Sequence, residues 1–173
     1  SLGRPVRVLE IGARGGSASQ LLLSQLDDIS LVVSDPSSLP LQDAKAKFGV
    51  DPRVEFRCFD PEKPLAQQNM ELHEFDAIVA FNALHRSQDL TQMLGQSLQL
   101  LQPGGLVLAS ELTVNSPLLD VSVALLEKGY KDLRDLRAGR MAPLLSDADW
   151  KTCLRESGFT TQLTLAPSKN AGL

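Results

Sequence analysis

The chain of 173 residues carries 17 basic and 21 acidic residues, for a formal net charge of -4 at pH 7. This balance offers no basic stripe of the kind that nucleic acid or an anionic lipid surface needs, so neither a nucleic-acid nor a membrane partner is expected. The length favours one domain with one core, over residues 1–173. No 18-residue apolar run and no typical leader is present, which favours a cytoplasmic protein.

Strand and helix patterns alternate along almost the whole chain. Ser17 and Ser146 are predicted N-caps, Gly49 and Gly158 are predicted helix ends, and residues 61–70 are predicted to form a loop with a short helix. In chain order, the pattern predicts a strand at 7–11, a helix at 17–26, a strand at 30–34, a helix at 37–48, strands at 54–59 and 75–81, a helix at 89–101, a strand at 106–111, a helix at 147–157 and a final strand at 160–165.

This alternation predicts an α/β fold with a doubly wound, mostly parallel sheet and right-handed crossovers. In such folds a ligand binds beyond the carboxyl ends of the strands. Polar residues gather at those predicted ends, although each one could be an ordinary cap or turn residue. They are Glu10, Asp35, Asp60, Asn82, His85 and Glu111.

The two cysteines, Cys58 and Cys153, are far apart in the sequence and lack metal-ligand spacing. Each lies in an apolar segment, where a buried thiol is the common outcome. We therefore expect both side chains in the core and no metal site.

A glycine-rich turn follows the first predicted strand, in the sequence VLEIGARGG at 8–16. Gly12 can adopt backbone angles that are closed to other residues, and Gly15 and Gly16 have no side chain to keep a ligand from the main chain. The turn therefore indicates a cradle for a nucleotide cofactor. Glycine in a tight strand-to-helix turn for steric reasons alone is the alternative.

Three segments together resemble the class I S-adenosylmethionine-dependent methyltransferases, and more narrowly the C-methyltransferase domains (type 12) of polyketide and nonribosomal peptide synthetases. They are VLEIGARGG at 8–16, FDAIVAFNALH at 75–85 and LLQPGG at 100–105, and the resemblance covers about residues 6–165. It implies a Rossmann-like methyltransferase core with S-adenosylmethionine as the cofactor. The implied cofactor-binding residues are Glu10, Gly12, Arg14, Gly16, Asp35, Phe59, Asp60 and Asn82.

Two of these positions have a physical reason and an alternative. A carboxylate at Asp35 can accept hydrogen bonds from both ribose hydroxyls; the alternative is a cap for the following helix. Asp60 can accept from the adenine amine, with Phe59 near the ring, but Asp60-Pro61 is also an ordinary turn dipeptide.

Arg14 departs from the family pattern, because it occupies the middle glycine of the cofactor turn. Its side chain would collide with the methionine portion of the cofactor or pair with the carboxylate of that portion. Alternatively, Arg14 points to solvent with the glycine geometry shifted to Gly15, or the site has decayed into a structural module.

His85 and Glu111 are the predicted catalytic residues. A neutral imidazole suits removal of an acidified α-proton, and a carboxylate from the neighbouring strand end would orient the ring and fix its tautomer. The family resemblance implies the same dyad. The expected reaction is C-methylation of a β-ketoacyl or related thioester held on the phosphopantetheine arm of an acyl- or peptidyl-carrier domain.

Two other functions stay open from the sequence. The chain could be an epimerase that uses His85 without methyl transfer, or a structural spacer with no catalytic activity. The family's synthetase domains also carry an N-terminal lid and a further last strand, and we expect neither in this sequence. We therefore expect a core excised from a larger synthetase, with neighbouring synthase domains as partners.

Overall fold

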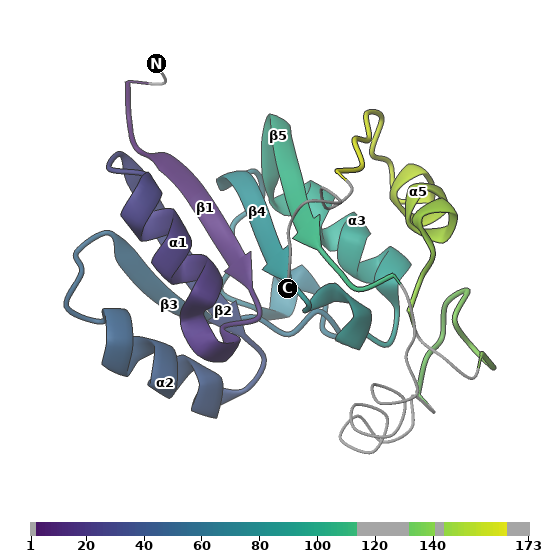
Figure 1. Cartoon of the computed structure of the whole chain (residues 1–173), viewed down its shortest axis with the longest axis horizontal. Helices are drawn as coiled ribbons and strands as arrows, with labels where there is room; N and C mark the ends of the chain where they lie inside the picture. The colour runs from purple at the N-terminus through teal and green to yellow at the C-terminus, as the bar shows by residue number, and fades with distance from the viewer. Residues whose placement is uncertain (1–2, 114–131, 141–143, 166–173) are drawn as a thin grey trace, which may run out of the picture.

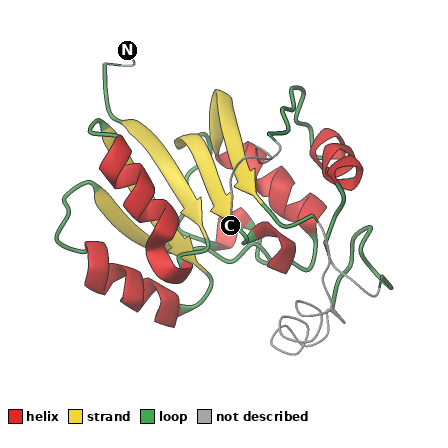
Figure 2. Ribbon diagram, viewed as in Figure 1, coloured by secondary structure: helices red, strands yellow, loops and turns green. Residues whose placement is uncertain are grey.

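The computed structural model describes residues 3–113, 132–140 and 144–165. Its strands form one five-stranded parallel sheet in the order β3-β2-β1-β4-β5. The strands are β1 Val6–Ile11, β2 Ile29–Asp35, β3 Val54–Cys58, β4 Phe75–Phe81 and β5 Leu101–Ser110. The helices are α1 Ser17–Gln25, α2 Ser38–Phe48, α3 Leu90–Leu100 and α5 Asp147–Glu156, with short 3-10 helices η1 Arg14–Gly16, η2 Leu65–Gln67 and η3 Leu84–Arg86. Figure 2 shows them against the sheet.

Helices cover both faces of the sheet. Neighbouring side chains of a strand point to opposite sides, so each strand packs against helices on both faces. In β1, Val8 packs in an apolar cluster that also holds side chains of α1 and α2. The next residue, Leu9, packs in the second cluster, with α3 and α5. Such strands, buried on both faces, read as continuous apolar runs. The structure thus confirms the predicted doubly wound α/β fold.

The strand ends that matter for a ligand lie together at one edge of the sheet (Figure 1). Ile11 at the end of β1 is in register with Ser34 of β2 on one side and Ala80 of β4 on the other. Ala80 is in turn in register with Ala109 of β5. The turns after β1, β2, β4 and β5 are therefore neighbours in space.

The helix ends follow the expected signals with one exception. Asp89 caps α3 by accepting a hydrogen bond from the Gln92 amide at 2.9 Å, and Ser146 forms a capping box with Asp149 at the start of α5. The prediction of Ser17 as an N-cap is wrong: Ser17 is the first helical residue and Gly16 is the cap. The predicted short helix within 61–70 is confirmed as η2.

Three other sequence predictions are corrected by the structure. Residues 160–165 form no strand, and Leu163 and Leu165 are exposed; their alternating pattern suits a strand, but a strand also needs a partner. The strand predicted at 106–111 instead begins at Leu101, directly after α3. A register shift between Phe75 and Ala77 takes up the Pro-Gly-Gly residues. Cys58 is exposed, because it ends the edge strand β3, whereas Cys153 is buried as expected.

No helix among the residues with described structure is long and apolar enough to cross a membrane.

Candidate active site

The glycine-rich turn after β1 has glycine at two positions for reasons of packing. Gly12 has a φ of 89°, and a Cβ there would lie 2.7 Å from the Cβ of Ala83. Gly16 has a φ of 70°, and its Cβ would lie 2.6 Å from the ring of Phe48. A Cβ at Gly15 would meet nothing closer than 4.0 Å. At Gly12 and Gly16 the missing side chain makes room for Ala83 and Phe48. At Gly15 it leaves the main chain open.

The Arg14 side chain lies outside the described part of the structure, so each of its predicted roles stays a prediction. Its backbone opens the 3-10 helix η1. Beside it, the Nζ atom of Lys47 donates to the carbonyl of Gly15 at 2.9 Å and ties this helix to α2.

Asp35, at the end of β2, is 1% exposed and its two carboxylate oxygens differ. Oδ1 accepts a hydrogen bond from the Ser37 amide at 2.9 Å. Oδ2 is buried and has no partner among the described residues. A buried acceptor without a donor costs about 1 to 3 kcal/mol, so Oδ2 suits a donor brought by a ligand. The turn interaction thus leaves Oδ2 available, and the ribose contact of Asp35 stays a prediction.

Glu10 lies one strand away from Asp35 and is 2% exposed. Burial raises the pKa of its carboxyl group, and the hydroxyl of Ser19, which donates to Oε2, offsets part of this rise. Its assignment to the cofactor stays a prediction.

Asp60 makes the turn contacts that the Asp-Pro pair suggests. Its Oδ1 accepts from the Glu62 amide at 3.0 Å, and its Oδ2 lies 3.2 Å from the Nζ of Lys63. Phe59 is 1% exposed and packs in the core. The adenine contact of Asp60 and the place of Phe59 near the adenine ring stay predictions.

His85 and Glu111, from the turns after β4 and β5, lie in direct contact. The Nδ1 atom of His85 is 2.7 Å from Oε2 of Glu111, and the side chains are 13% and 4% exposed. The other carboxylate oxygen of Glu111, Oε1, accepts from the backbone amides of Ala83 and Leu84, each at 2.8 Å. An ionised carboxylate only accepts, so a hydrogen bond between these atoms would place a proton on Nδ1, and in that tautomer of a neutral ring the free lone pair would lie on Nε2.

Asn82 directly follows β4 and has a left-handed backbone conformation, with a φ of 45°. Asparagine tolerates this region better than most residues. Its amide donates to Ser110 of β5 at 2.8 Å, which fixes the sharp turn that leads to His85. A contact of Asn82 with a cofactor stays a prediction.

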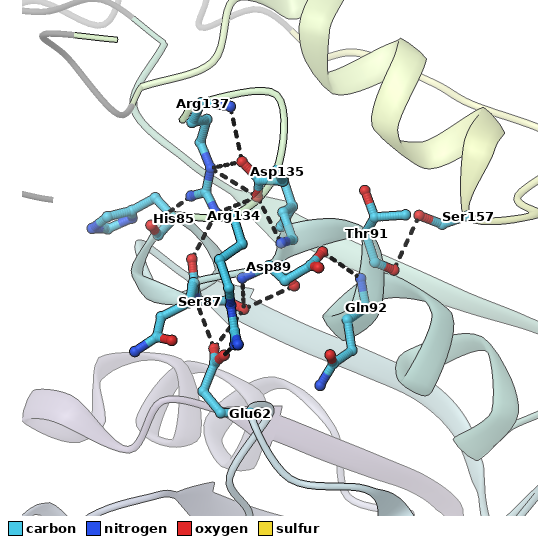
Figure 3. Close-up of polar contacts among 12 residues, drawn as sticks. Glu62, His85, Ser87, Asp89, Thr91, Gln92, Arg134, Asp135, Arg137 and Ser157 are labelled. Atoms are coloured by element: carbon cyan, nitrogen blue, oxygen red, sulfur yellow. Dashed lines mark hydrogen bonds and ion pairs between the residues drawn. The ribbon is translucent and has the colours of Figure 1, made fainter. Parts of the chain in front are cut away.

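Four residues near the dyad were missed by the sequence reasoning: Glu62, Arg134, Asp135 and Arg137. They connect the turn after β3, the segment 134–137 and the segment 85–90 (Figure 3). The repeated Asp-Leu-Arg at 132–134 and 135–137 was a visible signal, but nothing in it indicates a partner.

Within this group, Asp135 forms an ion pair with Arg137, which is 0% exposed. Burial raises the pKa of Asp135, but hydrogen bonds from Arg137 and from the amides of Leu90 and Arg137 outweigh it, so the pKa lies below its ordinary value. Among the described residues, no group of histidine, cysteine, aspartate and glutamate side chains is placed to hold a metal ion.

Comparisons with known proteins show the family of this chain. Residues 9–107 match the family described as "Methyltransferase domain". The chain is 34% identical over 160 residues to the hybrid PKS-NRPS synthetase thnA of Trichoderma harzianum, a match that covers 88% of this chain and 4% of that protein. The chain thus spans a small fraction of the curated relatives that it matches.

Two solved structures are close in both sequence and fold. The CurJ carbon methyltransferase superposes with a TM-score of 0.87 at 31% identity, over 97% of this chain and 46% of that one. The trans-methyltransferase CalH, in complex with SAH, gives a TM-score of 0.78 at 32% identity, over 89% of this chain and 44% of that one. With the family match over more than half of its residues, this chain belongs to the methyltransferase-domain family, and its relatives are polyketide synthases and hybrid synthetases.

Proposed function

We propose that this chain is the S-adenosylmethionine-dependent C-methyltransferase domain of a polyketide or hybrid synthetase, acting on a carrier-bound β-ketoacyl thioester. The observation that carries the proposal is the contact of 2.7 Å between Nδ1 of His85 and Oε2 of Glu111. His85 lies two residues after Ala83, against which Gly12 packs. A base held by a carboxylate is needed for methylation at carbon, where a C–H proton must leave.

The cofactor assignment is supported by the buried, unpartnered Oδ2 of Asp35 and by the open main chain at Gly15. Asp35 would hold the ribose, and the turn at 12–16 would face the methionine portion. S-adenosylmethionine supplies an electrophilic methyl group on a sulfonium centre. The matched structure of CalH is a complex with SAH, which supports this choice.

The residues of the chain then act on the acyl substrate. The lone pair of Nε2 in His85 accepts the α-proton, and the electron pair of the broken C–H bond moves into the enolate of the thioester. Glu111 holds Nδ1–H and stabilises the imidazolium that forms. With S-adenosylmethionine bound, the α-carbon of the enolate would take up the methyl group as the bond between the methyl carbon and the sulfonium sulfur breaks, which leaves S-adenosylhomocysteine. The proton on Nε2 would then leave to solvent.

The relatives support the carrier domain and neighbouring synthase domains as partners, because they are multidomain synthetases. A thioester on a phosphopantetheine arm also acidifies the α-carbon, which brings its proton within reach of a histidine base.

The test uses the purified protein with S-adenosylmethionine and a β-ketoacyl pantetheine thioester in deuterated buffer. Mass spectrometry follows methyl transfer and α-proton exchange together. Wild type is expected to methylate, and His85→Ala is expected to lose both reactions while its cofactor affinity, measured by calorimetry, stays within about twofold. Wild-type exchange without methylation would instead favour the epimerase, and neither exchange nor cofactor binding would favour a structural spacer.

A further inference from the structure

One buried ion pair holds both ends of the segment 85–90, which carries His85 into α3. Arg137 donates from Nη1 to the carbonyl of His85 at 2.7 Å and from Nη2 to the carbonyl of Ser87 at 2.6 Å. Asp135 accepts from the amide of Leu90 at 2.7 Å through Oδ2. The pair therefore joins the carbonyl end of η3 to the amide start of α3.

A contribution to the stability of the fold does not by itself explain why an ion pair is buried here. The two side chains are 0% and 2% exposed, with Nη2 of Arg137 2.5 Å from Oδ2 of Asp135. Apolar residues of similar volume often stabilise a core as well as a buried ion pair does. An ion pair differs in fixing direction, since a guanidinium group holds several acceptors in one plane.

The direction fixed here is that of the His85 backbone. Figure 3 shows Arg137 between the carbonyl of His85 and the carboxylate of Asp135, with the imidazole ring directed away from the guanidinium group. On the ring side, Glu111 binds Nδ1 and the amides of Ala83 and Leu84. The turn of η3 is thus held at its amide end by Glu111 and at its carbonyl end by Arg137.

We propose that Asp135 and Arg137 are positioning residues for His85, which set the place of its ring through the main chain. This inference rests on the proposed role of His85 as the base. A misplacement of about 1 Å at a reacting group can cost roughly 100-fold in rate. The hydrogen bonds described for the pair go to its own segment and to residues 85–90, so cofactor binding should not depend on it.

The test replaces the pair without leaving a buried charge alone. The double variant Asp135→Asn, Arg137→Met keeps an acceptor for the Leu90 amide and the apolar stem of the arginine, but removes the donors to His85 and Ser87. Arg140→Met is the matched control, because Arg140 also forms an ion pair, with Asp149 at 3.0 Å, and is partly exposed. Arg137→Lys keeps the charge and can reach one of the two carbonyls.

Two readouts are taken on each protein. The first is kcat for methylation beside the dissociation constant of S-adenosylmethionine. We expect kcat to fall about 10- to 100-fold in the double variant and less in Arg137→Lys, with the dissociation constant within about twofold throughout. The control should match wild type. A kcat within twofold of the control, or a cofactor affinity that falls in step with kcat, would overturn the proposal.

The second readout is the Nδ1–H resonance of His85 in nitrogen-15 NMR, which needs no turnover. The chain has two histidines, so a His73→Gln protein completes the assignment. Loss or broadening of this resonance in the double variant supports the proposal, and an unchanged resonance overturns it. If wild type fails to methylate, the proposed function fails, but this spectrum still decides the positioning role. Should the double variant not fold, Arg137→Lys decides by the same two readouts.

Discussion

Replacing Glu111 by glutamine should reverse the tautomer of His85 and so remove the base while keeping the ring in place. Oε1 of Glu111 accepts from the amides of Ala83 and Leu84, and Oε2 accepts from Nδ1 of His85. A glutamine has one oxygen and one NH2 group for these two places. If the oxygen stays with the two amides, the NH2 group faces Nδ1, which must then accept, and the ring proton moves to Nε2.

The opposite orientation of the glutamine is the costly one. It would turn an NH2 group toward the two backbone donors at 83 and 84, leaving both without an acceptor. Each unsatisfied buried donor costs about 1 to 3 kcal/mol, or about 2 to 6 kcal/mol for the two. That preference exceeds thermal energy severalfold, so the tautomer with a proton on Nε2 should dominate.

The expected loss in methylation and in α-proton exchange is about 10²- to 10⁴-fold, the usual contribution of a general base. Exchange and product formation are measured with the thioester assay above, and nitrogen-15 NMR reports which ring nitrogen carries the proton. Glu111→Asp, which keeps the charge but shortens the reach, is the control for tautomer. The reasoning is refuted if Glu111→Gln keeps its proton on Nδ1, or keeps rates within about threefold of wild type.

Three further predictions concern the turns around this site. Asp35→Ala should weaken S-adenosylmethionine binding in calorimetry by about 1 to 3 kcal/mol, since it removes the free Oδ2 acceptor; unchanged binding would count against the ribose contact. Gly12→Ala should lower the free energy of unfolding by about 2 to 5 kcal/mol, from its φ of 89° and the contact with Ala83. In urea denaturation Gly104→Ala, at a φ of 82° with nothing within 4 Å, should lose less, and equal losses would contradict the contact. Burial raises the pKa of Glu10 in the folded protein. The protonated carboxyl group therefore stabilises the fold below its ordinary pKa of 4.5, and this contribution is lost as the pH rises through the raised pKa of the folded state. Glu10→Gln should therefore gain stability relative to wild type as pH rises, and a pH-independent difference in unfolding free energy would disprove this.

The sequence was sufficient to predict the fold class and the alternation of strands and helices along most of the chain. Apolar runs such as the one at 75–81 indicate strands buried on both faces, and alternation with helices then favours parallel pairing. The contact between His85 and Glu111 also follows from sequence, because consecutive parallel strands were expected to be neighbours. The local apolar pattern predicts the strands, and the topology of a parallel sheet then predicts that the ends of β4 and β5 are neighbours.

Other features depend on partners that are distant in the chain. The exposure of Cys58 follows from the edge position of β3, and no property of its own segment indicates that position. Arg137 lies about fifty residues from the carbonyls that it binds, and no periodicity links the two segments. The two backbone amides that donate to Glu111, those of Ala83 and Leu84, were equally hidden from sequence reasoning.

The central question is whether the wild-type protein adds a methyl group to carbon in a manner that requires His85. The decisive measurement is the mass and position of the product formed from a β-ketoacyl pantetheine thioester and S-adenosylmethionine labelled in its methyl group, for wild type and His85→Ala in parallel. The account predicts a labelled methyl group on the α-carbon with wild type and none above background with His85→Ala, although both proteins bind the cofactor. A labelled product formed at equal rates by both proteins would contradict it, as would a label found on oxygen or nitrogen.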